Sequence, residues 1–245
     1  MSKTFYMVFA VAAYLIFFAT FLYLIAFVGN LFVPLTIDEG GAQTSVAVAI
    51  AVNVTLIALF GIQHSVMARK EFKAAWTKVV PKPIGRAVYV LTASAMLCVL
   101  CYFWRPIAGD VWRVKNTYFA AALWALFALG WIIVLASTFL INHFELFGLQ
   151  QVWRNMRGQH EAPFKFRTPL FYRLVRHPLY SGFLLAFWAT PHMTWGHMLF
   201  SIGMTIYILI AISYEEKDLV GYFGQEYEQY QRNVGTLVPG LGKRN

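Results

Sequence analysis

Long apolar stretches dominate this chain and restrict what it can fold into. Hydrophobic residues make up 59% of the 245 positions and charged residues only 13%, about half the charged share of a soluble domain. Four stretches, at 5–28, 42–62, 87–104 and 117–141, approach the roughly 20 apolar residues that a helix needs to cross a bilayer. Because a backbone in lipid must satisfy its own hydrogen bonds, the sequence predicts an all-α polytopic membrane protein.

A fifth apolar region, at 179–214, is interrupted by Thr190, Pro191 and His192. Its first arm has about 12 residues, or roughly 18 Å at the helical rise, which is too short to cross a bilayer alone. We interpret this region as a helical hairpin with Pro191 in its turn, which gives five to six membrane segments. The length fits one domain, 1–245, because no linker rich in Gly, Pro or Ser divides the chain.

Positive charges are divided unevenly among the connecting segments. Six Lys and Arg residues lie in each of the segments 63–86 and 143–178, four follow Tyr214, and Lys3 precedes the first span. The loops 29–41 and 105–116 together hold three. Because Lys and Arg stay in the cytoplasm, both termini and both basic segments are predicted to be cytosolic. The net charge of +9 is therefore a topology signal, with some attraction to the lipid bilayer, and does not indicate nucleic-acid binding.

Two polar segments complete the outline. We expect the segment 150–173 to be irregular as far as Pro169, and the segment 215–233 to form an amphipathic helix. Its apolar positions recur at helical spacing on one face: Leu219, Phe223, Tyr227 and Tyr230. That face is suited to lying on the membrane and also to closing over a cofactor, and the two interpretations are compatible.

Ionisable residues flank the predicted hairpin. Its first arm begins within Arg176-His177-Pro178-Leu179-Tyr180-Ser181-Gly182, and its second arm ends at Glu215-Glu216. Charged groups at a membrane boundary cost free energy, so they indicate a functional site. The order and spacing resemble the isoprenylcysteine carboxyl methyltransferase superfamily of integral-membrane enzymes that use S-adenosylmethionine (SAM). The segments 61–69 and 142–149 look like one branch of it, the bacterial methanethiol S-methyltransferases.

The resemblance implies a SAM-dependent enzyme of the bacterial inner membrane that converts methanethiol, a small thiol, to dimethyl sulfide. It implies that SAM binds within residues 143–239, at the positions that match the motif residue by residue. Those positions are Arg176, His177, Pro178, Tyr180, Gly182, Glu215 and Glu216, and the matching Tyr227 and Tyr230 join them.

The chemistry of SAM fits these residue types. Its carboxylate needs a cation or backbone N–H groups, which Arg176 and the amides around Pro178 offer. Its ribose hydroxyls need a carboxylate such as Glu215 or Glu216. Adjacent helical residues point about 100° apart, so we expect one glutamate to face the cofactor and the other to anchor the tail through Arg or Lys. Tyr227 and Tyr230 are suited to walling the adenine, and no Gly-rich loop of the soluble nucleotide-binding type is present.

A thiol acceptor adds the need for a base. An alkyl thiol has a pKa near or above about 8.5, and neutral imidazole is the usual base at cytosolic pH. His143 and His64 are our candidates for this catalytic role, because both lie at predicted cytosolic span ends in segments that resemble the methanethiol branch. Two further histidines, His177 and His192, are considered, and two are weaker, His160 and His197. Direct methyl transfer requires no metal.

Two alternatives remain open. One is an enzyme of the same superfamily that methylates a lipid or a prenylcysteine. The other is a non-enzymatic membrane scaffold of the nurim-like class, in which the fold persists without turnover.

Overall fold

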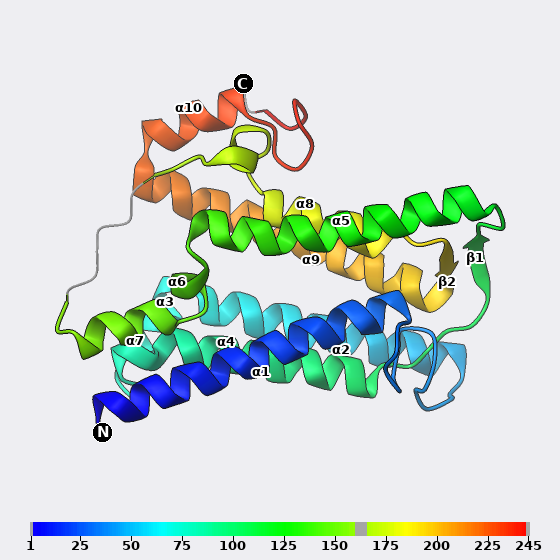
Figure 1. The fold of residues 1–245 in the computed structure, drawn as a ribbon, viewed down its shortest axis with the longest axis horizontal. Coiled ribbons are helices and arrows are strands. Elements are labelled where there is room, and N and C mark those ends of the chain that lie inside the picture. Colours follow the sequence, from blue (N-terminus) through cyan, green and yellow to red (C-terminus); the bar gives the residue numbers. More distant parts are fainter. Residues whose placement is uncertain (1, 160–165, 244–245) are drawn as a thin grey trace. The chain divides into compact units, whose positions relative to one another are not determined.

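The computed structural model describes residues 2–159 and 166–243 and is built almost entirely of helices (Figure 1). Five helices of the described chain are long and apolar enough to cross a membrane: α1 (Lys3–Gly29), α2 (Val46–Ala68), α4 (Lys82–Phe103), α5 (Thr117–Ile141) and α9 (Trp195–Phe223). The apolar α8 (Pro178–Trp188) is shorter. Large hydrophobic side chains are exposed along these helices, as lipid-facing surfaces require. The prediction of an all-α polytopic membrane protein is confirmed.

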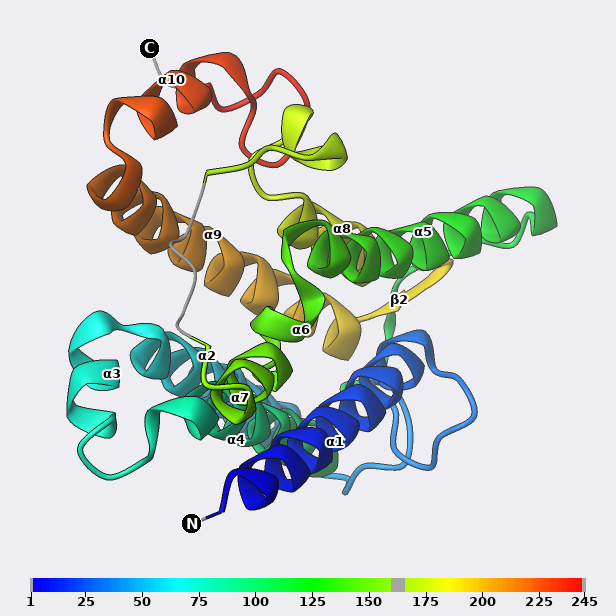
Figure 2. The ribbon, with the colours of Figure 1, turned by 60° about the vertical axis from the view of Figure 1, so that its left-hand side comes forward.

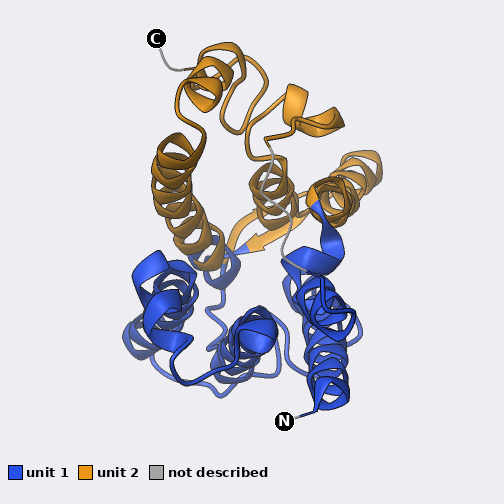
Figure 3. Ribbon diagram, turned by 90° about the vertical axis from the view of Figure 1, so that its left-hand side faces the viewer, with its two compact units in different colours: residues 1–109, 142–163, 194–199 blue, residues 110–141, 164–193, 200–245 orange. Residues whose placement is uncertain are grey.

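The chain forms two compact units, which Figure 3 colours separately. Unit 1 comprises residues 1–109, 142–163 and 194–199. Its helix α4 packs against both α1 and α2 (Figure 2). Small residues line this packing, since Ala10 and Ala13 of α1 share a buried cluster with Ala87 of α4.

Three short helices complete unit 1: α3 (Lys70–Trp76), α6 (His143–Leu146) and α7 (Leu149–Met156). The turn between α6 and α7 depends on Gly148, whose φ is +92°. A Cβ atom there would lie 2.7 Å from the backbone nitrogen of Ala87. Glycine therefore permits both the left-handed turn and the close approach of this segment to α4.

Unit 2 comprises residues 110–141, 164–193 and 200–245. Helix α8 packs along α5, and a short 3₁₀ helix, η1 (Leu170–Arg173), precedes α8. The strands β1 (Asp110–Arg113) and β2 (His192–Thr194) pair in a two-stranded sheet, and α10 (Gln225–Asn233) follows α9. The predicted hairpin is present as α8 and α9, with Pro191 in the segment between them.

Two local expectations were wrong. The segment 150–173 is not irregular throughout, because α7 forms a regular helix at 149–156. The tail is not one continuous helix either, because α9 ends at Phe223 and Gly224 adopts a φ of +57° before α10 begins. A left-handed glycine ends a helix at little steric cost, and the periodicity of the neighbouring apolar residues masked this break. His160 lies outside the described residues.

Candidate active site

The segment that precedes α8 is held against the C-terminal segment of unit 2. Val175 forms a parallel bridge with Gly235. The backbone N–H of Arg176 donates to the carbonyl of Gly235 at 2.8 Å, and that of His177 donates to the carbonyl of Thr236 at 3.1 Å. His177 is the N-cap residue of α8, and Pro178 follows in the first turn, where its missing N–H is no loss.

All the N–H donors of the Arg176 guanidinium are engaged in hydrogen bonds. A guanidinium carries five N–H donors. Its Nε donates to Glu216 Oε1 at 2.7 Å. The remaining acceptors lie in the C-terminal part of the chain: the carbonyls of Gln231 (3.1 Å), Val234 and Gly242 (3.2 Å), and Thr236 Oγ1 (2.8 Å). Arg176 therefore holds the end of α10 and the following turn to α9.

Glu216 lies at the centre of this buried cluster. Its Oε1 accepts from Arg176 and lies 3.3 Å from His177 Nε2, and its Oε2 accepts from Gln231 Nε2 at 3.0 Å. The side chains of Arg176 and Glu216 are only 1% and 4% exposed. A buried charge is tolerated only when it is paired and hydrogen-bonded, and this cluster meets that condition. The pairing with arginine matches the expectation that one of the two glutamates anchors the tail.

Glu215 points elsewhere. Its side chain is 46% exposed, and its Oε2 accepts from the hydroxyl of Tyr180 at 3.1 Å. His177 Nδ1 lies 3.9 Å from the same oxygen. The imidazole of His177 thus lies between the two glutamates, and Glu215 is the carboxylate that solvent or a ligand can reach.

Aromatic rings form a wall next to this cluster. The ring of Phe166 contacts those of Phe223, Tyr227 and Tyr230 at centroid distances of 5.2, 5.8 and 5.3 Å. The hydroxyl of Tyr230 donates to the carbonyl of Tyr172. Burial raises the pKa of Tyr230 to about 12 and also raises the pKa of Tyr227. Both phenols therefore stay protonated at neutral pH.

Tyr227 is the polar group of this wall that lacks a protein partner. Tyr227 is only 2% exposed, and its hydroxyl has no hydrogen-bond partner among the described residues. A buried hydroxyl without a partner carries a desolvation cost. The position therefore suits a ligand that brings a hydrogen-bonding group.

Gly182 has a packing role. A Cβ atom on Gly182 would lie 2.7 Å from the carbonyl oxygen of Gly130, and one on Gly130 would lie 2.7 Å from the carbonyl oxygen of Gly182. The two glycines thus let α8 and α5 approach closely. This contact fixes α8, and with it Tyr180, against α5.

His143 and His64 belong to unit 1, whereas the motif residues belong to unit 2. His143 is 3% exposed and lies in α6, among the rings of Tyr14, Phe144 and Phe147. Its Nε2 lies 2.9 Å from the hydroxyl of Tyr14 on α1. Burial lowers the pKa of His143 below its usual value, so the imidazole is neutral at pH 7. A neutral imidazole is the form that can accept a proton.

His64 has a similar arrangement in α2. Its Nε2 lies 2.8 Å from the hydroxyl of Tyr89 on α4, and its ring stacks on Phe60 at 5.4 Å. The guanidinium of Arg86 lies 4.9 Å from the ring of Tyr89 and donates to the carbonyl of Leu146 at 2.6 Å. Each candidate base is therefore paired with a tyrosine from a neighbouring helix.

His192 and His197 make contacts that hold the local structure. His192 is bound to Asp110 at 2.7 Å and to Arg113 at 2.9 Å. Hydrogen bonds from Arg113 and His192 hold the pKa of Asp110 at about 2. His197 is fully buried, and its backbone N–H donates to Thr194. No group of three His, Cys, Asp or Glu side chains that could hold a metal ion occurs in the described part of the chain.

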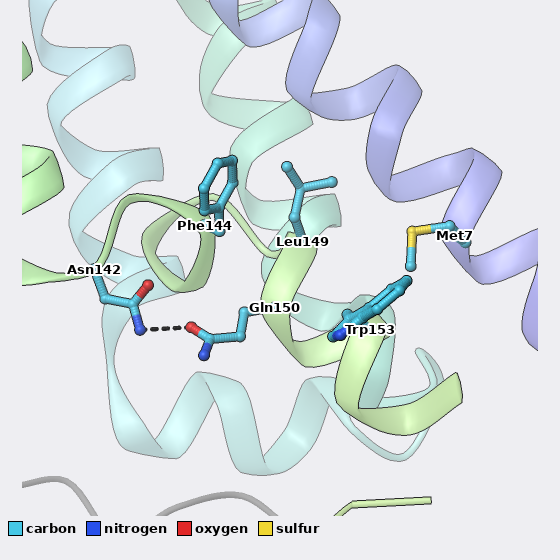
Figure 4. A pocket seen from close by; sticks show the side chains of 6 residues that line it. All are labelled: Met7, Asn142, Phe144, Leu149, Gln150 and Trp153. Carbon is cyan, nitrogen blue, oxygen red and sulfur yellow. Dashed lines mark hydrogen bonds between the residues drawn. The ribbon is translucent and has the colours of Figure 1, made fainter. Parts of the chain in front are cut away.

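A pocket of about 340 Å³ lies beside α6 in unit 1 (Figure 4). Four of its six lining residues are apolar, and Met7 of α1 points toward Trp153 of α7. The polar part is an amide pair in which Asn142 Nδ2 donates to Gln150 Oε1. Asn142 and Phe144 flank His143 in the chain, so this apolar pocket adjoins the segment that carries His143.

The sequence did not indicate every member of these clusters. Gln231 and Thr236 complete the Arg176 cluster, but they lie in polar segments where nothing distinguishes them from solvated residues. Tyr14 and Tyr89 were also missed. Each span carries several hydroxyl-bearing residues, and only helical packing shows which of them lies next to a histidine.

A protein-family model described as NnrU protein matches residues 52–237. The chain belongs to this family. Its similarity to individual proteins extends beyond the matched region. It is 47% identical to the methanethiol S-methyltransferase of Crocosphaera subtropica over 100% of this chain and 96% of that protein. It is 54% identical to that of Pseudomonas deceptionensis over 89% of this chain and 82% of that protein.

A more distant relative is nurim of Xenopus laevis, which is 28% identical over 87% of this chain and 78% of that protein. No solved structure matches the chain. The similarity to these relatives therefore extends over nearly the whole length of the chain.

Proposed function

We propose that this protein is a SAM-dependent methyltransferase that methylates methanethiol to dimethyl sulfide. The observation that carries the proposal is its 47–54% identity, over most of both chains, to relatives that are named methanethiol S-methyltransferase. The cluster of Glu215, Tyr180 and His177 supports it, because it offers a reachable carboxylate beside a helix N-terminus.

The residues of unit 2 fit SAM in three ways. The amides of the first turn of α8 suit its carboxylate, since the first N–H groups of a helix lack intrahelical partners. Glu215 suits the ribose hydroxyls, and the hydroxyl of Tyr227 with the ring of Tyr230 suits the adenine. Arg176 and Glu216, which are paired with each other, hold these groups in place.

When bound, SAM supplies an electrophilic methyl group. The protein contributes alignment, exclusion of water and removal of the thiol proton. His143 is the first candidate for the base, because burial keeps its imidazole neutral and Tyr14 orients its ring. His64 is the second, with Tyr89 in the corresponding role. No metal is required for this reaction.

The protein is placed in the membrane with a defined orientation. Both termini and the segments 63–86 and 143–178 face the cytosol of a bacterial inner membrane, because these segments carry most of the Lys and Arg residues. The whole chain, 1–245, is proposed to be one methyltransferase domain. A phosphatase reporter fused after Asn245 would be inactive, whereas one inserted near Glu39 would be active. The reverse pattern would place the SAM site on the side that lacks SAM.

The decisive experiment is enzymatic. The purified protein in lipid nanodiscs is supplied with SAM and methanethiol, and dimethyl sulfide is measured by gas chromatography. Parallel reactions contain a prenylcysteine analogue or an aminophospholipid as the acceptor. Dimethyl sulfide without methylation of the other two supports the proposal. Methylation of another acceptor alone would assign a different activity within the superfamily. Absence of SAM binding by the folded protein would indicate a scaffold of the nurim class.

A further inference from the structure

The C-terminal turn, residues 234–242, is built into the cluster that carries the motif. Four of the five N–H donors of Arg176 bind acceptors at or after Gln231. The backbone of the motif is held from the same side, because Arg176 and His177 donate their N–H groups to Gly235 and Thr236. The hydroxyl of Ser181, in the first turn of α8, donates to the carbonyl of Leu237 at 2.7 Å.

The turn also has a defined internal conformation. The N–H of Thr236 donates to the carbonyl of Leu241 at 2.8 Å, and its hydroxyl donates to the carbonyl of Gly242 at 2.9 Å. A Cβ atom on Gly235 would lie 2.3 Å from the carbonyl oxygen of Val238. Gly235 is therefore required by this fold of the turn.

Thr236 is the point at which the turn and the motif meet. Its hydroxyl accepts from Arg176 Nη2 at 2.8 Å while it donates to Gly242, and its carbonyl accepts from the backbone of His177. His177 in turn lies between Glu215 and Glu216. The position of the imidazole between the two carboxylates thus depends on a segment about 60 residues later in the chain.

We infer that the C-terminal turn is a positioning element of the SAM site and that Arg176 is its anchor, not a ligand of SAM. This inference rests on the proposed function. All five donors of Arg176 are bound to protein acceptors. Direct binding of a carboxylate by Arg176 would release at least one of them and loosen the turn, so the anchor and ligand roles exclude each other.

The test compares substitutions of equal size at two threonines of unit 2. Thr236→Val removes a hydroxyl that accepts one hydrogen bond and donates another. Thr205→Val does the same on α9, where the hydroxyl accepts from Trp188 Nε1 at 3.0 Å and donates to the carbonyl of Ser201 at 2.6 Å. Thr205 therefore controls for the general effect of losing such a hydroxyl. Thr236→Ser retains the hydroxyl and serves as the rescue variant.

SAM affinity is measured by calorimetry on the full-length protein in nanodiscs, with the thermal unfolding midpoint recorded in parallel. We expect Thr236→Val to weaken SAM binding about tenfold, with Thr236→Ser and Thr205→Val within about twofold of the wild type. Unchanged affinity in Thr236→Val, or an equal loss in Thr205→Val, would overturn the positioning role. Failure of the wild type itself to bind SAM would instead refute the proposed function.

Arg176→Lys separates the anchor from the ligand. Lysine keeps the positive charge but presents its donors from a single nitrogen atom and cannot reach acceptors spread over Glu216, Thr236 and Gly242. We expect Arg176→Lys to weaken SAM binding at least as much as Thr236→Val does. Affinity within about twofold of the wild type would mean that only the charge matters, which would overturn the role of Arg176 as an anchor.

Discussion

Units 1 and 2 accommodate buried polar side chains in different ways. In unit 1, His64 and His143 each share a hydrogen bond with one tyrosine hydroxyl, without a charged side chain in the pair. In unit 2, Arg176 and Glu216 form a charged cluster in which every donor of the guanidinium is used. A neutral pair can gain or lose a proton while it keeps its geometry, whereas a charged cluster resists any change of partner.

The comparison assigns different chemistry to the two units. The histidine pairs of unit 1 suit proton removal, because a hydroxyl can donate to a neutral imidazole and accept from an imidazolium. The cluster of unit 2 suits a rigid binding site, because its charges compensate each other and Glu215 remains reachable.

The largest effect is expected for the base. His143→Ala should lower the rate of dimethyl sulfide formation at pH 7 by about 10²–10⁴-fold. Burial lowers the pKa of His143 from the usual 6.5, so its neutral form persists to lower pH and the acid limb of the wild-type rate should lie below 6.5. The loss in His143→Ala should shrink toward pH 9.5, where more of the thiol is already ionised. The rate is measured by gas chromatography from pH 9.5 down to below 6.5, so that the acid limb is included.

His192→Ala is the matched control for this prediction. His192 is bound to Asp110 and Arg113 in an exposed cluster, so its removal should leave the rate unchanged. SAM affinity is measured for each variant to separate binding from proton removal. If His143→Ala and His64→Ala both retain nearly the full rate at pH 7, neither histidine is the base. Proton removal would then be assigned to a tyrosine, a carboxylate or water.

The second prediction concerns the charged cluster. Arg176→Met should lower the free energy of unfolding by about 3–5 kcal/mol, because it removes the guanidinium that compensates the buried charge of Glu216. Denaturant titration in a detergent micelle measures the loss. Arg113→Met is the control, since the exposed pair of Arg113 with Asp110 contributes little to stability. If Arg176→Met were as stable as the wild type, the charged cluster would not be what holds unit 2 together.

The third prediction distinguishes the two adjacent glutamates. Glu215→Ala should weaken SAM binding by about 10- to 150-fold, the effect of losing a charged hydrogen bond worth roughly 1.5–3 kcal/mol. Its stability should change little, because the side chain is 46% exposed. Glu216→Ala should lower both stability and SAM affinity. SAM affinity is measured by calorimetry and stability by unfolding for both variants. A loss of affinity in Glu216→Ala alone would contradict the role of Glu215 as the carboxylate that binds SAM.

Much of the fold followed from the sequence because lipid imposes simple rules on a chain. Apolar length located the spans, and α5 occupies Thr117–Ile141 as predicted. The break at Gly224 was missed, since Phe223 and Tyr227 keep helical spacing across it although the helix ends there. Periodicity records which face is apolar and does not record whether the backbone hydrogen bonds continue.

The candidate site was predicted only in part, for a different reason. Arg176 and Glu216 were singled out because charges at a membrane boundary are rare and their order resembles that of a family motif. Their partners Gln231 and Thr236 are ordinary polar residues, which become distinctive only when the turn folds back on α8. The sequence therefore identified the ionisable groups but not the network that decides which of them a ligand can reach.

The smallest expected effect tells the two histidine pairs of unit 1 apart. Tyr14→Phe removes the hydroxyl from His143 Nε2, and Tyr89→Phe removes it from His64 Nε2. One such hydrogen bond is worth about 1 kcal/mol, so Tyr14→Phe should lower the rate at pH 7 about fivefold with SAM affinity unchanged. Tyr23→Phe on the same helix, where the hydroxyl donates to the carbonyl of Leu35, should leave the rate unchanged. A loss in Tyr89→Phe alone would make His64 the base, because only the tyrosine that orients the reacting imidazole should affect turnover.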